Sequence, residues 1–230
     1  MRLTSEIRRR AIAAIGATLT ALAATAASAA TVNVTYQGSN PFGTPNLSRY
    51  VRINSTTGYS GGTFAGPFRL VGSGALGNFV GFCVDLAQFM TNGGTYNTAG
   101  ASGYGAAVDA NIDRLFTSAY ASISNRVQGA AFQVALWEII SDTSGGFDLG
   151  AGNFSVQNAV YSAPVIAQAN QYLGALAGAA TGGYRLTFLK SGTSQDLVTV
   201  SAVPIPAAAG MLGIGVFGLF AVGRRRKENA

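Results

Sequence analysis

The spacing of hydrophobic and polar residues divides this 230-residue chain into short strands, then helices, then a closing pair of strands. Between residues 31 and 36, Val32, Val34 and Tyr36 alternate with polar residues, which is the two-residue period of a half-buried β-strand. Stretches rich in Gly, Asn, Ser, Thr and Pro, including 91–105, are typical of turns and loops. We expect further strands at 50–53, 68–71, 78–84, 184–189 and 196–201.

Three segments instead repeat their apolar residues at the spacing of an α-helix. They span 106–121, 126–141 and 155–178, with Ser124 or Asn125 as the N-cap of the second. Pro164 should kink or interrupt the third. The pattern predicts an α+β domain over 31–201, in which short antiparallel strands form a sandwich or barrel and a cluster of about three helices is inserted.

Both ends of the chain carry targeting patterns. Residues 1–30 combine an arginine-rich start, an apolar run and small residues up to Ala29, which predicts a cleaved signal peptide for the general secretory route. A retained N-terminal anchor and the twin-arginine route are the weaker alternatives. Near the other end, 207–223 is an apolar stretch just long enough for a transmembrane helix, and a basic tail follows it.

Charge and composition exclude several function classes. The formal charge of +6 comes from the two ends, since the region between them holds seven basic and seven acidic residues, so we expect no nucleic-acid partner. The sequence has no histidine, which removes Ser-His-Asp and Cys-His catalysis and histidine metal sites. We expect no turnover enzyme, no cofactor and no metal. The helical pairs Asp109 with Asp113 and Glu138 with Asp142 could bind calcium, but such pairs are usually solvated helix faces.

The C-terminal segment 202–230 resembles a PEP-CTERM sorting signal in its Val-Pro-x-Pro-Ala variant (VPLPA-CTERM). A proline motif, the apolar helix 207–223 and a basic tail follow one another in the order of that signal. The resemblance implies a Gram-negative surface protein that is anchored transiently in the inner membrane and processed by an exosortase. A plain single-span anchor is the alternative. The matching residues are Val203, Pro204, Pro206, Arg224, Arg225 and Arg226.

Two residues inside the domain are unusual for their surroundings. Cys83 is the only cysteine, and Gln133 lies four residues before the only tryptophan, Trp137, on the apolar helix 126–141. A glutamine in an apolar surface needs a hydrogen-bond partner. A single cysteine in an exported protein is intermolecular, buried or chemically used. The plainest interpretation is a buried Cys83, a Gln133 bonded to neighbouring main chain and a Trp137 in the core.

The segments F-C-V-D at 82–85 and Q-V-A-L-W at 133–137 are together similar to the signature of thioester domains, which occur on surface adhesins and are sometimes named for a T-Q-x-A motif. In those domains a cysteine thiol displaces ammonia from a glutamine side chain. The resemblance implies that Cys83 supplies the sulfur and Gln133 the acyl carbon of an internal thioester. Phe132 stands where the family has threonine. The residues expected around the bond are Phe82, Asp85, Leu136, Trp137 and Glu138.

Two functions follow from these patterns for a protein of the cell surface or extracellular matrix. The first is a covalent adhesin, whose thioester is attacked by amines or hydroxyls of a partner. The second is a non-reactive structural or exopolysaccharide-binding envelope protein of the same fold.

Overall fold

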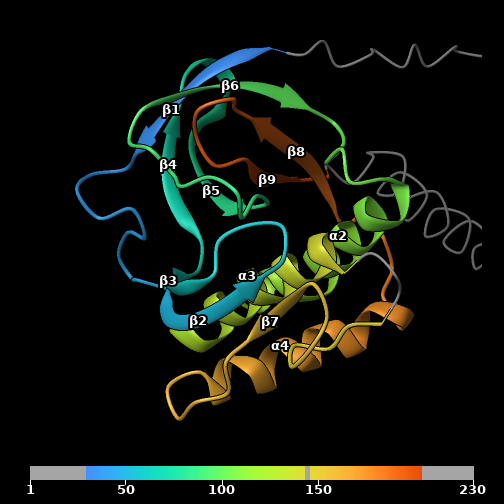
Figure 1. Ribbon diagram of the computed structural model, residues 1–230. Helices are drawn as coiled ribbons and strands as arrows, with labels where there is room; N and C mark the ends of the chain where they lie inside the picture. The colour runs from blue at the N-terminus through green and yellow to red at the C-terminus, as the bar shows by residue number, and fades with distance from the viewer. Residues whose placement is uncertain (1–29, 143–145, 204–230) are drawn as a thin grey trace, which may run out of the picture.

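The computed structural model describes residues 30–142 and 146–203, and it arranges their strands in two sheets next to three helices (Figure 1). Six strands close into an antiparallel barrel in the order β1-β4-β5-β9-β8-β6. The barrel strands are β1 (Thr31–Tyr36), β4 (Phe68–Gly72), β5 (Gly77–Cys83), β6 (Gly94–Ala99), β8 (Tyr184–Lys190) and β9 (Leu197–Ala202). The predicted mixed fold with barrel-like antiparallel strands and about three helices is confirmed for this part of the chain.

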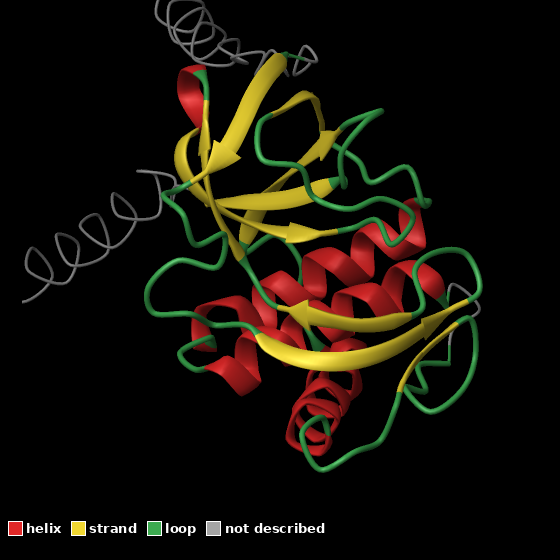
Figure 2. Ribbon diagram, turned by 60° about the vertical axis from the view of Figure 1, so that its left-hand side comes forward, coloured by secondary structure: helices red, strands yellow, loops and turns green. Residues whose placement is uncertain are grey.

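The second sheet is small and lies along the helices (Figure 2). Its strand order is β3-β2-β7, with both pairs antiparallel. These strands are β3 (Gly61–Ala65), β2 (Arg49–Ser55) and β7 (Phe154–Val156), and the helices are α2 (Ala106–Ala119), α3 (Arg126–Ser141) and α4 (Ala163–Ala175).

Helix α3 is the central element of the molecule. It contacts the other two helices, the small sheet and β5, and every residue from Gly129 to Ile140 is buried. A helix that is apolar on all sides is stable only in such a position. Its start is fixed as the sequence predicts, because the side chain of Asn125 accepts a hydrogen bond from the Gln128 N–H at 3.0 Å.

An aromatic cluster joins the barrel to the helices. The ring of Phe82, on β5, lies 4.6 Å from that of Phe132 on α3 and 5.7 Å from that of Phe116 on α2, measured between centroids. All three side chains are fully buried. Such contacts hold β5 and α3 in a fixed relation, which positions the residues at the end of β5.

The structure differs from the sequence-based expectation in three short strands, β3, β6 and β7, and in one helix start. The stretch 91–105 contains β6, whose pairing with β1 and β8 closes the barrel. Strand β7 replaces the start of the helix expected at 155–178, which begins at Ala163. Pro164 therefore lies in the first turn of α4, where its missing N–H removes no helical bond, and it does not kink the helix.

Several predictions fall on residues outside the described part. The signal peptide 1–30, apart from Ala30, the sorting residues beyond Val203 and the apolar stretch 207–223 all lie there. Over 30–142 and 146–203, no helix has the length and apolar character that a membrane span requires.

Candidate functional site

Cys83 lies at the end of β5, and its side chain is only 3% exposed. Strand β9 flanks it on one side, where Leu197 is its partner, while the pairing of β5 with β4 stops at Gly81. Gln133 of α3 fills the open edge. The Cys83 N–H donates to Gln133 Oε1 at 3.0 Å, and Gln133 Nε2 donates to the Cys83 carbonyl at 2.8 Å. The buried amide thus takes the place of a neighbouring strand and satisfies both main-chain groups of Cys83.

The sulfur of Cys83 contacts a different glutamine, Gln195. Its Sγ donates to Gln195 Oε1 at 2.7 Å, and Gln195 Nε2 donates to the Asp85 carbonyl at 2.6 Å. Gln195 is 9% exposed and lies two residues before β9. The amide of Gln133 therefore binds the main chain of Cys83. The side-chain amide that contacts the thiol of Cys83 is that of Gln195.

Sequence reasoning missed Gln195 because no pattern marks it. It precedes a predicted strand in a polar segment, and polar residues are ordinary there. Its nearness to Cys83 follows from the pairing of β9 with β5, which is a contact between residues 112 positions apart. Gln195 could have been identified only from a predicted topology that places the last strand, β9, beside the strand that carries Cys83, β5.

The thiol is protonated in its resting state. Burial raises the pKa of Cys83 well above its usual value, and the negative charge of Asp85 raises it further. A protonated thiol can donate to the Gln195 oxygen and is a poor nucleophile for small reagents from solvent. The surroundings of Cys83 therefore protect its sulfur from reagents in solvent and hold the sulfur against the Gln195 amide.

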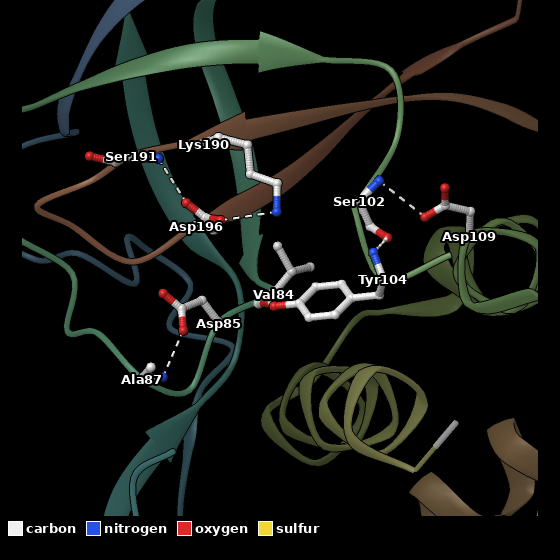
Figure 3. Close-up of polar contacts among 9 residues, drawn as sticks. All are labelled: Val84, Asp85, Ala87, Ser102, Tyr104, Asp109, Lys190, Ser191 and Asp196. Atoms are coloured by element: carbon white, nitrogen blue, oxygen red, sulfur yellow. Dashed lines mark hydrogen bonds and ion pairs between the residues drawn. The ribbon is translucent and has the colours of Figure 1, made fainter. Parts of the chain in front are cut away.

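Polar contacts fix the two chain segments that carry Cys83 and Gln195 (Figure 3). The Tyr104 hydroxyl donates to the Val84 carbonyl at 2.6 Å. Burial, with the nearby charges of Asp85 and Asp196, raises the pKa of Tyr104 to about 12, so the hydroxyl remains a donor at physiological pH. Next to Gln195, Asp196 forms an ion pair with Lys190 at 3.0 Å. Both segments are thus held from outside the site.

A cavity of about 270 Å³ opens beside the sulfur. Cys83, Gln195 and Trp137 contribute to its wall, and none of the residues that line it carries a charge. The indole Nε1 of Trp137 is buried and has no hydrogen-bond partner among the described residues. The remaining lining residues are Tyr36, Pro41, Phe42, Ile53, Tyr59, Thr63, Phe64, Phe68, Leu86, Gln88, Phe89 and Met90.

The five residues expected around the bond have different positions. Phe82 and Leu136 are fully buried, and Trp137 lines the cavity. Asp85 contributes its carbonyl to Gln195 and uses its carboxylate to accept a bond from the main chain two residues later. Glu138 has a separate role, because its Oε1 accepts the N–H of Asp148 in the connection that follows α3.

Like Glu138, the other three carboxylates of the two helical pairs support local structure. Asp109 accepts the Ser102 N–H at 3.0 Å, and Asp113 accepts the Gly182 N–H at 3.0 Å. Asp142 accepts the N–H of Asn153 at 2.9 Å. In the described part of the chain, no three residues of types that bind metals lie close enough together to hold an ion.

No protein-family model matches the sequence, and no curated protein matches it either. Among solved structures, the chain is similar to the N-terminal domain of the Streptococcus pyogenes pilus tip adhesin Cpa, with a TM-score of 0.46 and 12% identity over 75% of this chain and 94% of that one. It is also similar to the N-terminal thioester domain of a surface protein from Clostridium perfringens, with a TM-score of 0.42 and 11% identity over 76% of this chain and all of that one.

Proposed function

We propose that this protein forms an internal thioester between Cys83 and Gln195 and uses it once, to attach itself covalently to a partner. The observation that supports the proposal is the 2.7 Å contact between Cys83 Sγ and Gln195 Oε1 at the wall of an uncharged, largely apolar cavity. A thioester is destroyed by water, so an enclosure with few polar groups favours its survival.

The chemistry balances with these two side chains alone. The sulfur attacks the side-chain carbonyl carbon of Gln195, the carbon–nitrogen bond breaks, and ammonia leaves with the thiol proton. The later attack by an amine or hydroxyl of the partner forms a carbon–nitrogen or carbon–oxygen bond. The carbon–sulfur bond then breaks, and the sulfur takes up the proton that the nucleophile loses. Because the high pKa of Cys83 favours the thiol, protonation of the leaving sulfur helps to complete the transfer.

Gln133 has a positioning role in this proposal. Both ends of its amide are already bonded to the main chain of Cys83, at 3.0 and 2.8 Å. Reaction at either glutamine removes an amide donor, but the carbonyl that Gln133 satisfies, that of Cys83, is buried, whereas the carbonyl that Gln195 satisfies, that of Asp85, is only partly buried. The loss at Gln133 therefore costs more. A thioester between Cys83 and Gln133, as the sequence suggested, is the second candidate.

We further propose that the domain reaches the cell surface or extracellular matrix through the signal peptide 1–30. The segment 202–230 would anchor it transiently in the inner membrane through 207–223 until an exosortase processes it. An attachment function requires such a location, since the partner is outside the cell. Exopolysaccharide and surface proteins are the two partner classes that carry suitable hydroxyls or amines.

Methylamine trapping followed by tandem mass spectrometry identifies the acyl donor. The full chain is incubated with methylamine and digested, and the peptides that contain Gln133 and Gln195 are sequenced. We expect N-methylation at Gln195 alone, and none in a Cys83→Ala variant. Methylation at Gln133 would favour the second candidate. Absence of methylation at both would overturn the thioester and leave a non-reactive structural or polysaccharide-binding envelope protein.

A further inference from the structure

A row of aromatic rings leads from the outer face of the small sheet to the thiol cavity. Tyr161 and Tyr50 have ring centroids 5.5 Å apart, Tyr50 and Phe64 are 5.9 Å apart, and Phe64 and Phe42 are 6.1 Å apart. Phe42 stacks on Phe68 at 5.3 Å. Phe64, Phe42 and Phe68 also line the cavity beside Cys83. We call these five residues the aromatic row.

The outer end of the row is exposed although its rings are apolar. Phe64 is 56% exposed, Tyr50 40% and Tyr161 38%. The main chain at Tyr161 is held by Arg49, whose Nε donates to the Tyr161 carbonyl at 2.9 Å. Exposed rings that continue into a cavity are typical of a binding surface.

Rings of this kind suit sugars. A pyranose ring has a face of C–H groups that packs on the negative face of an aromatic ring, while its hydroxyls stay in water. The cavity adds polar groups without charge, because Tyr59, Thr63 and Gln88 belong to its lining. Such groups both donate to and accept from sugar hydroxyls, whereas none of them supplies the negative charge that would pair with the ammonium of a lysine side chain.

The reacting group must be an amine, because the cavity holds no base. Its lining has no carboxylate, and the sequence has no histidine. A sugar hydroxyl needs a base to remove its proton, whereas the neutral form of an amine attacks a thioester directly. Lysine has a pKa of about 10.4 and is almost entirely protonated at neutral pH. The amine of an amino sugar is less basic, since the neighbouring oxygen substituents withdraw electrons, and an uncharged cavity favours this neutral form.

Resting on the thioester proposed above, we infer that the partner is a polysaccharide that carries free amino sugars. The aromatic row holds the sugar chain, and one amino sugar enters the cavity. Its nitrogen forms an amide with the side-chain carbon of Gln195, the carbon–sulfur bond breaks, and the proton lost by the amine passes to Cys83.

The test compares covalent capture of four probes by the full chain at pH 7. These are a glucosamine oligomer, its N-acetylated form, an Nα-acetyl-lysine amide and methylamine. We expect the glucosamine oligomer to react fastest at equal amine concentration and its N-acetylated form not to react. Phe64→Ala and Tyr50→Ala should slow capture of the oligomer about fivefold to tenfold, the scale of one lost ring contact. Tyr50→Ala, whose ring is not part of the cavity lining, should leave capture of methylamine unchanged, and Val160→Ala, which truncates a side chain that is 95% exposed, should change neither rate.

The outcomes separate this inference from the thioester itself. Faster capture of the lysine probe, or capture of the N-acetylated oligomer through its hydroxyls, would overturn the amino-sugar partner. Equal oligomer rates in the Phe64→Ala, Tyr50→Ala and unsubstituted proteins would remove the role of the aromatic row. In each case methylamine capture would persist and the thioester would stand. Loss of methylamine capture itself would overturn both proposals.

Discussion

At the scale of single residues, two glutamines divide the work around Cys83. Gln133 binds the main chain of the cysteine through both ends of its amide, and Gln195 contacts the sulfur. The importance of Gln133 was predictable, since an amide on an apolar helix must find a partner. Which atoms it meets was not predictable, because the open edge of Cys83 depends on where the pairing of β4 with β5 stops.

Gln133→Ala should destabilise the fold. The change leaves the N–H and the carbonyl of a buried residue without partners, and unmet buried groups cost about 1–3 kcal/mol each. We expect the free energy of unfolding, measured with urea, to fall by about 2 kcal/mol or more. Gln171→Ala, at an exposed position of α4, is the matched control and should change stability little. Equal stability of the two variants would show that the Gln133 amide does not support Cys83.

At the scale of elements, α3 packs so closely against the segment before β2 that the helix requires a glycine at position 129. A Cβ added at Gly129 would lie 2.2 Å from the carbonyl oxygen of Leu47. By contrast, a Cβ at Gly174 of α4 would meet nothing within 4 Å. The same substitution should therefore have opposite effects in the two helices.

Gly129→Ala should lower the free energy of unfolding by about 1–3 kcal/mol, because the overlap outweighs the better helix propensity of alanine. Gly174→Ala should raise it by about 0.5–1 kcal/mol, since only the propensity changes. Denaturant unfolding of both variants checks this. A stabilising Gly129→Ala would mean that α3 and the segment around Leu47 are not in close contact.

The end of α3 contains a pH-sensitive anchor. Burial, together with the negative charges of Asp142 and Asp148, outweighs the hydrogen bond from the Asp148 N–H and raises the pKa of Glu138 from 4.5 to about 7. Between these pH values the folded state binds more protons than the unfolded state, so the free energy of unfolding falls as pH rises from about 4.5 to about 7.

Glu138→Gln should remove this decrease in the free energy of unfolding with pH, because the amide oxygen still accepts the Asp148 N–H but the side chain no longer titrates. The variant should be more stable than the natural protein by about 1–3 kcal/mol at pH 8, and this advantage should shrink towards pH 5. Urea unfolding across pH 5 to 8 measures the difference. A stability difference that is constant over this range would contradict a raised pKa at Glu138.

At the scale of the whole molecule, the barrel, the helices and the small sheet meet at one cavity. The sequence predicted α3 with its observed bounds and most barrel strands, because their apolar periods are strong. It did not predict β3 or β6, whose residues are mostly small or polar, nor β7, whose three residues become a strand through pairing with the distant β2. The cavity was hidden for the same reason, since Cys83, Trp137 and Gln195 come from three separate regions of the chain.

The intact mass of the full chain, measured before and after methylamine, tests the thioester most directly. We expect the mass of this protein to be lower, by one ammonia, than the mass calculated from its sequence. We also expect the sulfur of Cys83 to resist alkylation under denaturing conditions. Methylamine should then add to the protein and free Cys83 for alkylation, while a Cys83→Ala variant keeps its full mass throughout. A natural protein of full mass, with a thiol that alkylates equally before and after methylamine, would contradict the thioester.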